Sequence, residues 1–342
     1  MSDRIEELKS TAQAMVAPGK GILAADESSP TIGKRFAKLG IDSTEEARRS
    51  YREMFFTADG IADYVSGVIL YDETIRQSAS DGTPFPQLLK SMGIVPGIKV
   101  DTGAKELAGA PGEKITEGLD GLRDRLAEYY ELGARFAKWR AVITIGEGVP
   151  SYYCIHANAH ALARYAALCQ EAGIVPIVEP EVLMDWSNDI DVCEQVTRKT
   201  LHEVFDQLYW QRIQFEGMVL KPNMIVSGIK CPDQAGVEEV AHRTLAVLKD
   251  CVPASVAGIA FLSGGQSDEA ASSHLNAMNQ IGGAPWPLTF SYGRALQSAA
   301  MQTWAGKSEN VSAGQQAALL RAKCNSAATY GKYSEEMELV GV

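Results

Sequence analysis

The chain has 342 residues, and 43 aspartates and glutamates outweigh 32 lysines and arginines, so the formal net charge is −11. This acidity argues against nucleic acid or an anionic membrane surface as a partner. No apolar run reaches the length of a membrane-spanning helix, and the charged, amphipathic N-terminus is not typical of a secretory signal. Six cysteines without a C-x-x-C pair indicate reduced thiols in a cytoplasmic protein.

Helical patterns and short apolar runs alternate along the chain. One helical pattern contains Leu162 and Cys169, ends near Gly173 and is followed by an apolar run. Gly133, Gly173 and Gly217 each stand where the C-terminal cap of a helix is expected. The apolar runs are bounded by turn residues and do not alternate with polar residues, which is typical of strands buried in a parallel sheet. Eight such strands are predicted, at residues 21–26, 65–71, 97–101, 134–139, 174–179, 217–221, 257–263 and 288–293.

The spacing of these strands predicts the fold class. Successive strands begin roughly 30 to 45 residues apart, which leaves room for one crossover helix each. Eight such units predict an α/β fold of the (β/α)8 (TIM) barrel type. A doubly wound open sheet is the alternative, but it usually begins with a G-x-G-x-x-G fingerprint, and none follows the first predicted strand. No linker divides the chain, so we expect a single domain over residues 1–342, with a short tail at about 331–342.

Charged residues gather at the carboxyl ends of the predicted strands, where barrels carry their chemistry. Each of them alone is consistent with a structural role, such as a solvated strand end or a helix start. Five strands that bring charged groups to one rim would be electrostatically costly without a task. The residues are Asp26 after the first strand, Lys99 on the third, Lys138 and Arg140 with the fourth, Glu179 and Glu181 with the fifth, and Lys221 at the end of the sixth.

Two lysines and several carboxylates in one dry pocket fit Schiff-base catalysis. Lysine attacks a carbonyl only as a neutral amine, and its ordinary pKa of about 10.4 keeps it protonated near pH 7. Desolvation and a neighbouring ammonium favour the neutral form. The apolar strand before Lys221 offers the first effect and Lys138 the second. Glu179 would then move protons during imine formation, and Asp26 would take a hydroxyl proton as a carbon–carbon bond breaks.

The loops after the last two predicted strands suggest an anionic substrate. They contain S-G-G-Q-S, from Ser263, and S-Y-G-R, which ends at Arg294. A hydroxyl, a guanidinium and backbone N–H groups near glycines suit an anion, and such barrels usually bind phosphate at these loops. S-G-G alone is also consistent with a plain turn. Lys99 and Arg140, across the mouth, would hold a second phosphate, so we expect a sugar bisphosphate.

These segments resemble a known family. GILAADES, GIKVD, FAKWR, PIVEPE, LKPNM, FLSGGQS and FSYGRALQ, in this order between Gly21 and Gln297, are similar to motifs of the class I (Schiff-base) fructose-bisphosphate aldolases. The resemblance implies a metal-independent barrel enzyme, usually a homotetramer, of glycolysis and gluconeogenesis. It implies reversible cleavage of fructose 1,6-bisphosphate to dihydroxyacetone phosphate and glyceraldehyde 3-phosphate.

The resemblance also implies roles for individual residues. Lys221 matches the imine-forming lysine, and Glu179 matches the general acid/base. Asp26 and Lys138 match groups that flank the reacting carbons, and Glu181 matches a carboxylate that supports the lysines. The C1 phosphate site is matched by Ser263, Gly264, Gly293 and Arg294, and the C6 phosphate site by Ser28, Lys99 and Arg140, with Thr31 where many relatives have serine. Two further positions, Arg35 and Trp139, match family residues near the pocket.

Two departures from the family pattern matter. Many relatives contain K-V-D-K-G, whereas Thr102 replaces the second lysine here. Animal relatives end in a mobile tail whose terminal tyrosine helps to exchange the enamine proton, whereas this sequence ends at Val342 with Tyr330 and Tyr333 upstream. The resemblance therefore assigns no residue to enamine protonation. Glu179, a bound phosphate and a different tail contact are the alternatives.

Three competing functions fit the sequence less well. A metal-dependent aldolase needs histidines and carboxylates around zinc, but of the five histidines only His156 and His160 share helical spacing, and they lack the glutamate of an H-E-x-x-H motif. We expect these two to be a satisfied histidine pair. A transaldolase-like or other sugar-phosphate lyase is disfavoured by the paired phosphate groups. A catalytically inactive scaffold is disfavoured as the primary role by the intact set of charged residues.

Overall fold

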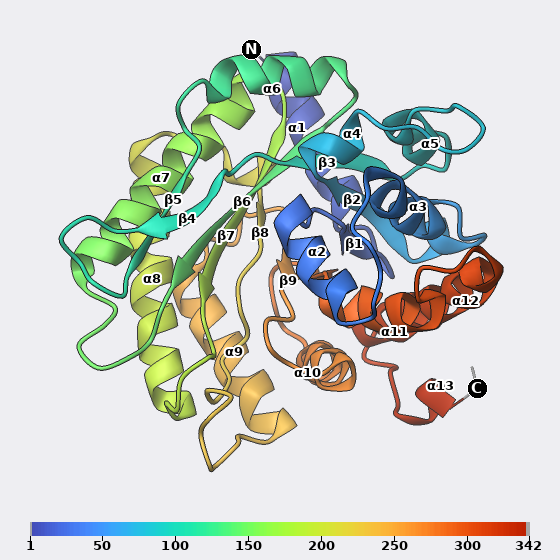
Figure 1. The fold of residues 1–342 in the computed structure, drawn as a ribbon. Coiled ribbons are helices and arrows are strands. Elements are labelled where there is room, and N and C mark those ends of the chain that lie inside the picture. The colour runs from blue at the N-terminus through green and yellow to red at the C-terminus, as the bar shows by residue number, and fades with distance from the viewer. Residues whose placement is uncertain (1, 340–342) are drawn as a thin grey trace.

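The computed structural model describes residues 2–339, and its centre is a closed barrel of eight parallel strands surrounded by helices (Figure 1). The predicted (β/α)8 fold is therefore confirmed. The strands follow one another around the barrel in chain order, and the last pairs with the first to close it. They are β1 (Gly21–Ala24), β2 (Val65–Leu70), β3 (Val95–Lys99), β6 (Phe136–Ile143), β7 (Val175–Val182), β8 (Val219–Leu220), β9 (Gly258–Phe261) and β10 (Leu288–Tyr292).

Helices form the outer layer. In the part of the chain that the structure describes, no helix has the length and hydropathy to cross a membrane. The α-helices are α1 (Ser2–Met15), α2 (Ser29–Ala37), α3 (Glu45–Phe56), α4 (Asp72–Ile75), α5 (Phe85–Ser91), α6 (Leu122–Glu131), α7 (Tyr152–Glu171), α8 (Ile190–Trp210), α9 (Val237–Cys251), α10 (Asp268–Ile281), α11 (Arg294–Trp304), α12 (Val311–Thr329) and α13 (Glu336–Leu339). Short 3-10 turns lie at Ile61–Asp63, Phe215–Gly217 and Ser308–Asn310.

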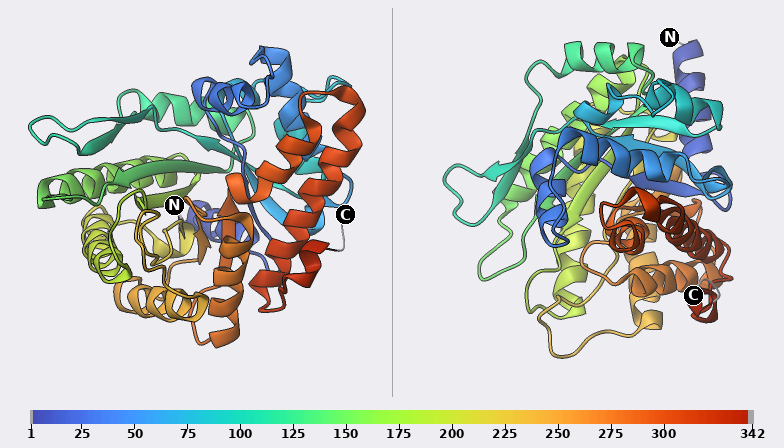
Figure 2. Two further views of the ribbon diagram at one scale, coloured as in Figure 1. Left: turned by 60° about the horizontal axis from the view of Figure 1, so that its bottom comes forward. Right: turned by 45° about the vertical axis from the view of Figure 1, so that its right-hand side comes forward.

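All eight predicted strands exist, with shifted ends. β6 and β7 continue beyond the predicted limits to Ile143 and Val182, whereas β8 holds only two residues. Pro222 explains the short strand, because proline has no N–H with which to extend a ladder. The sequence missed an antiparallel hairpin of β4 (Gly103–Glu106) and β5 (Lys114–Glu117). This hairpin projects from the body of the molecule (Figure 2), and β4 is mostly exposed and polar, so it carries no apolar pattern.

The predicted glycine caps of helices are confirmed at two of three positions. Gly133 and Gly173 follow the last turns of α6 and α7 with φ of +107° and +76°, values that favour glycine. Gly217 is not a cap, which corrects the expectation. Helix α8 ends earlier, at Trp210, and the chain reverses through Arg212 with φ of 60°.

Apolar side chains fill the lower part of the barrel and form a floor for the site. Phe136 of β6 occupies the space next to Gly67 and Gly97, where a Cβ atom on Gly97 would lie 2.3 Å from the ring. Helix α1 adds Leu8 and Met15 to the same buried cluster. Lys138, two residues after Phe136, faces the same side of β6 because side chains alternate along a strand. The charged layer therefore lies directly above an apolar one.

Candidate active site

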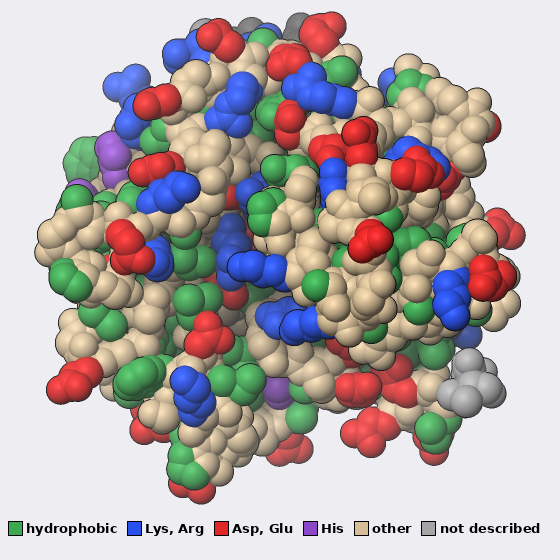
Figure 3. All heavy atoms as spheres, in the orientation of Figure 1, with side chains coloured by type: hydrophobic (Ala, Val, Ile, Leu, Met, Phe, Trp, Pro, Cys, Tyr) green, Lys and Arg blue, Asp and Glu red, His purple; other side chains and the backbone are tan. Residues whose placement is uncertain are grey.

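A cavity of about 590 Å³ opens at the carboxyl ends of the barrel strands. Figure 3 shows this hollow near the centre of the view, with lysine and arginine side chains around it. The structure brings the residues assigned to catalysis and to the two phosphate sites together in the lining of this cavity. Its charged lining consists of Asp26, Glu27, Lys34, Arg35, Lys38, Lys99, Asp101, Lys138, Arg140, Glu179, Glu181, Lys221 and Arg294.

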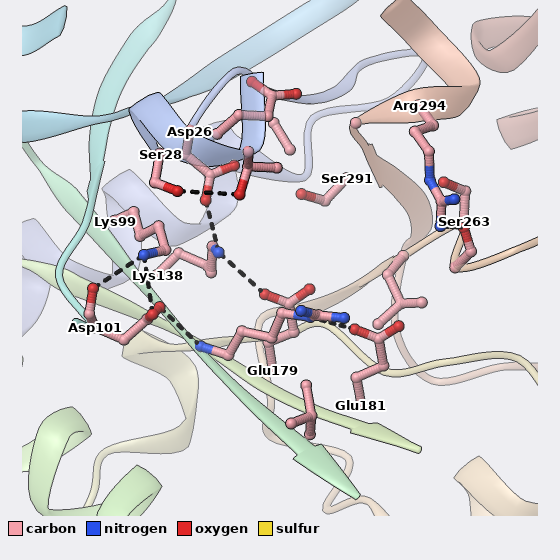
Figure 4. Close-up of a pocket in the computed structure, with 18 of the residues that line it drawn as sticks. Asp26, Ser28, Lys99, Asp101, Lys138, Glu179, Glu181, Ser263, Ser291 and Arg294 are labelled. Carbon is pink, nitrogen blue, oxygen red and sulfur yellow. Dashed lines mark hydrogen bonds and ion pairs between the residues drawn. The ribbon is translucent and has the colours of Figure 1, made fainter. Parts of the chain in front are cut away.

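Four buried charged groups form a continuous chain across the floor of the cavity. Lys221 Nζ lies 3.2 Å from Oε1 of Glu179. The other oxygen of Glu179, Oε2, lies 3.5 Å from Lys138 Nζ, which lies 2.6 Å from Oδ2 of Asp26 (Figure 4). Two ammonium groups thus alternate with two carboxylates, so each buried charge has an opposite neighbour, as a dry site requires.

The two groups at the Asp26 end keep their charges. Burial alone would raise the pKa of Asp26, but the positive charges of Lys138 and Lys221 lower it to about 2. Burial alone would lower the pKa of Lys138, but Asp26, Glu179 and Asp101 raise it above its usual value. Lys138 therefore remains an ammonium group near neutral pH and places a fixed positive charge between the two carboxylates.

The pairing of the strands fixes the position of these side chains along the barrel axis. Lys138 lies beside Lys99 of β3 and Ile177 of β7 in the barrel register, and Arg140 lies beside Glu179. Lys221 directly follows β8, and its N–H donates to the carbonyl of Val178 at 2.8 Å. The apolar run before Lys221 is the barrel wall itself. The buried lysine consequently ends at the floor of the cavity, with its ammonium group on Glu179.

One side of the cavity is built by the loops after β9 and β10. Gly264 has a φ of +56°, in the left-handed region that favours glycine. Arg294 begins helix α11, and its Nη2 donates to the carbonyl of Gly264. Ser263 and Gly293 complete this wall, and Figure 4 shows Ser263 beside Arg294. A hydroxyl and a guanidinium therefore lie together with two glycines on this side of the cavity.

The opposite side is built by α2, β3 and β6. At the first turn of α2, the hydroxyl oxygens of Ser28 and Thr31 lie 3.0 Å apart. Three cations face this part of the cavity with a carboxylate partner each. Arg35 pairs with Glu27 at 2.7 Å, Lys99 with Asp101 at 3.0 Å, and Arg140 with Glu181. These carboxylates hold the cations in place.

One residue of the family pattern stands next to lining residues without lining the cavity, and several lining residues were not predicted. Trp139 does not line the cavity; it is fully buried on the other face of β6 and packs on Tyr165, with ring centroids 5.6 Å apart. Alternation along the strand explains this, since Lys138 faces inward and its neighbour cannot. The missed lining residues include Glu27, Lys34, Lys38 and Ser291. The i, i+3 and i+4 spacing of Thr31, Lys34, Arg35 and Lys38 on one helix face was the available signal.

Neither the histidines nor the upstream tyrosines line this cavity among the described residues. His156 and His160 bind side chains of α8 instead: their Nδ1 atoms lie 2.7 Å from Oε1 of Glu203 and 3.1 Å from Oε1 of Gln207. Tyr333 is buried and donates to Glu338, and Tyr330 ends α12. Val342, at the end of the sequence, lies outside the described residues.

Comparisons with known proteins point to one family. A family model for fructose-bisphosphate aldolase class-I matches residues 7–340. The chain is 59% identical over 330 residues to a probable fructose-bisphosphate aldolase class 1 of Xanthomonas axonopodis pv. citri, covering 96% of this chain and 99% of the relative. It is 52% identical over 335 residues to a cytosolic fructose-bisphosphate aldolase of Arabidopsis thaliana, with 98% and 93% coverage.

A solved structure is also similar. It is the fructose-bisphosphate aldolase of Plasmodium falciparum in a ternary complex with TRAP and a small-molecule inhibitor. The TM-score is 0.96 at 48% identity, over 98% of this chain and 97% of that one. The chain therefore belongs to the class I fructose-bisphosphate aldolases, lyases of glycolysis and gluconeogenesis that cleave fructose 1,6-bisphosphate reversibly through a lysine Schiff base.

Proposed function

We propose that Lys221 is the amine that forms the Schiff base with the ketone carbon of the substrate. The observation that carries this assignment is the buried chain Asp26–Lys138–Glu179–Lys221. Lys221 stands at one end of it, and Glu179 lies within reach of its nitrogen. A carboxylate at that distance can take a proton from the attacking amine and return one to the departing hydroxyl of the carbinolamine.

Cleavage of the carbon–carbon bond depends on Asp26, at the other end of this series of charged groups. With the substrate held as an imine on Lys221, the C4 hydroxyl gives its proton to Asp26 as the C3–C4 bond breaks. The bonding electrons pass to the protonated imine, which becomes an enamine, and glyceraldehyde 3-phosphate leaves. Lys138 remains positive and stabilises the oxygen on which charge develops. Protonation of the enamine at C3 and hydrolysis of the imine then release dihydroxyacetone phosphate.

Glu179 is the proposed donor in the enamine step. It lies between Lys221 and Lys138. Glu179 has returned its own proton to the departing hydroxyl, so the proton for C3 is the one that Asp26 takes from the C4 hydroxyl, passed to Glu179 through Lys138. Glu181 supports this arrangement through Arg140. No described residue of 330–339 lines the cavity, so the proposal needs no group from this segment.

The two walls of the cavity are proposed to bind the two phosphates. The C1 phosphate lies against Ser263, Gly264, Gly293 and Arg294, and the C6 phosphate against Ser28, Thr31, Arg35, Lys99 and Arg140. The support is the surplus of cations in this lining over its carboxylates, within a protein of net charge −11. Comparing kcat/KM for fructose 1,6-bisphosphate and fructose 1-phosphate tests the second site. Equal values would contradict the proposal that this second group of residues binds the C6 phosphate.

The metal-independent mechanism has its own test. Borohydride in the presence of dihydroxyacetone phosphate is expected to inactivate the enzyme, because it reduces the imine to a stable amine. EDTA is expected to leave the cleavage rate unchanged. Loss of cleavage in EDTA, restored by a divalent metal, would instead indicate a metal-dependent aldolase.

The assembly and location are proposed on the basis of the family. We expect one barrel domain with a short tail at about 331–342, four copies in the active enzyme and a cytoplasmic location. The matched plant relatives are described as cytosolic. Light scattering on the purified protein tests the assembly, and a mass other than four chains would contradict it.

A further inference from the structure

A second group of chemically reactive side chains lies on the outer helices, away from the cavity. His202 projects from α8, and Asp250 and Cys251 form the end of α9. Helices α8 and α9 pack side by side (Figure 1). One ligand atom from each of the three residues lies within 4.8 Å of the others. None of the three lines the active-site cavity.

The separation of the two softer ligands suits a transition metal. Cys251 Sγ lies 3.5 Å from Nε2 of His202. In a tetrahedral zinc site, with Zn–S near 2.3 Å and Zn–N near 2.05 Å, sulfur and nitrogen lie about 3.6 Å apart. The two atoms are therefore already separated by the edge of such a tetrahedron. Cys251 is buried, whereas His202 and Asp250 are exposed, so a metal ion from solvent has an entry path.

The local charge also favours a cation. The adjacent Arg198 is paired with Asp250 and with Glu194 at 3.0 Å, so its charge is neutralised. Asp250 has a second carboxylate oxygen for a metal while it keeps Arg198 as its hydrogen-bond donor, an arrangement typical of ligating carboxylates. Asp250 and Cys251 stand in the last turn of α9, where the helix presents unpaired carbonyls and a partial negative charge.

We propose that His202, Asp250 and Cys251 bind one zinc ion that links α8 to α9. The imidazole Nε2, one carboxylate oxygen and the thiolate are three ligands, and a water molecule completes the tetrahedron. Binding replaces the thiol proton, which is released to solvent, and involves no change of oxidation state. The ion has a structural role, because its ligands come from both helices, and it takes no part in aldol cleavage. The proposal does not rest on the roles assigned to the active-site residues.

Cobalt(II) is the probe for the site, because its thiolate complexes absorb in the near ultraviolet and tetrahedral geometry gives strong visible bands. Titration of the full-length wild-type protein is expected to give both signals at one equivalent per chain, and zinc is expected to displace them. Cys251→Ser is expected to lose the thiolate band. His202→Ala and Asp250→Asn are expected to bind cobalt at least about tenfold more weakly, since each removes a ligand.

Two control variants separate this site from adventitious binding. Cys231→Ser removes a partly exposed thiol elsewhere, and His156→Ala removes an exposed imidazole on α7. Both are expected to titrate like the wild type. The proposal is overturned if Cys251→Ser keeps the thiolate band, if the controls lose it, or if wild-type protein shows no band at one equivalent. The last result would mean that Cys251 and His202 share only a thiol–imidazole hydrogen bond.

A thermal-unfolding measurement distinguishes folding defects from lost ligands. Zinc is expected to raise the Tm of the wild-type protein, and EDTA to reverse this rise, whereas the rise in His202→Ala should be clearly smaller at the same zinc concentration. The cleavage rate is expected to stay the same in all of these variants. Equal zinc responses in the wild type and His202→Ala would contradict the proposal, even with full aldolase activity.

Discussion

The ammonium nitrogen of Lys138 lies 2.6 Å from Oδ2 of Asp26, and both side chains are almost completely buried. This pair keeps Asp26 ionised and Lys138 positive in a place where either charge alone would be expensive. Because Lys138 also reaches Glu179, the pair ties the proposed base for carbon–carbon cleavage to the proposed proton carrier at Lys221. The four residues therefore act as one electrostatic unit.

Replacing Lys221 with methionine is expected to abolish cleavage and leave phosphate-ligand binding intact. Methionine fills a similar volume but offers no amine, and the phosphate-binding walls keep their own residues. Steady-state rates and calorimetric binding of a non-cleavable bisphosphate measure the two effects. Lys307→Met, at an exposed position outside the cavity, is the matched control and should behave like the wild type. A residual rate near that of the wild type would refute the assignment.

Asp26 is expected to make the protein less stable in acid. Its pKa in the folded protein, about 2, is below its ordinary value of 3.8, so it binds fewer protons when folded than when unfolded. The stabilisation is fully present above about pH 4 and is lost as the pH falls through about 2. The shift corresponds to about 2 kcal/mol.

Urea unfolding at several pH values measures this effect, with Asp26→Asn as the comparison. Between pH 5 and pH 3 the free energy of unfolding should fall more steeply in the wild type than in Asp26→Asn. Parallel pH profiles would show that the carboxyl contributes nothing to the acid sensitivity.

Arg294→Ala is expected to weaken substrate binding. Arg294 is exposed, so if its guanidinium holds the C1 phosphate, its removal is expected to cost about 1.5 to 3 kcal/mol, the range for a hydrogen bond to a charged group. KM should rise accordingly, with a smaller change in kcat. Arg294→Lys keeps the charge without the planar fork and should fall in between. Arg123→Ala, at an exposed position outside the cavity, serves as the control. An effect confined to kcat would contradict a phosphate role.

Deleting residues 334–342 is expected to reduce stability and leave enamine protonation unchanged. Glu338 of α13 pairs with Arg321, whose buried guanidinium also donates to the carbonyl of Asp268 at 2.8 Å. Loss of the carboxylate leaves this cation without a counter-charge, at a cost of about 1.5 to 3 kcal/mol.

Glu338→Gln separates the two effects in that deletion. It should show part of the destabilisation and wild-type kinetics. The exchange of the C3 proton of dihydroxyacetone phosphate, followed by NMR in D₂O, measures the protonation step. A large drop in exchange in the deleted protein would assign the step to this segment and not to Glu179.

Much of this site can be predicted from the sequence because buried barrel strands are recognisable as apolar runs. A strand covered on both faces is a short apolar run, and the residue that ends it stands at the rim. The sequence alone therefore predicts that Lys221, Glu179 and Asp26 meet at one end of the barrel. The ends of the strands are harder to predict, since β8 is cut short by Pro222 and β6 continues past Arg140.

The remaining features depend on tertiary packing. Lys34 and Lys38 reach the cavity only because α2 lies at its mouth. The family position of Trp139 implies that the residue is near a pocket but not which face of the strand its buried side chain occupies. The contact between Cys251 and His202 joins residues 49 positions apart on two helices, and no local pattern indicates it.

The most direct test of the central claim is peptide mapping after borohydride reduction with dihydroxyacetone phosphate. The account predicts one reduced triose adduct per chain, on the peptide that contains Lys221, and none in Lys221→Met. A modified lysine elsewhere, or an unmodified position 221 in an enzyme that still cleaves its sugar, would contradict it.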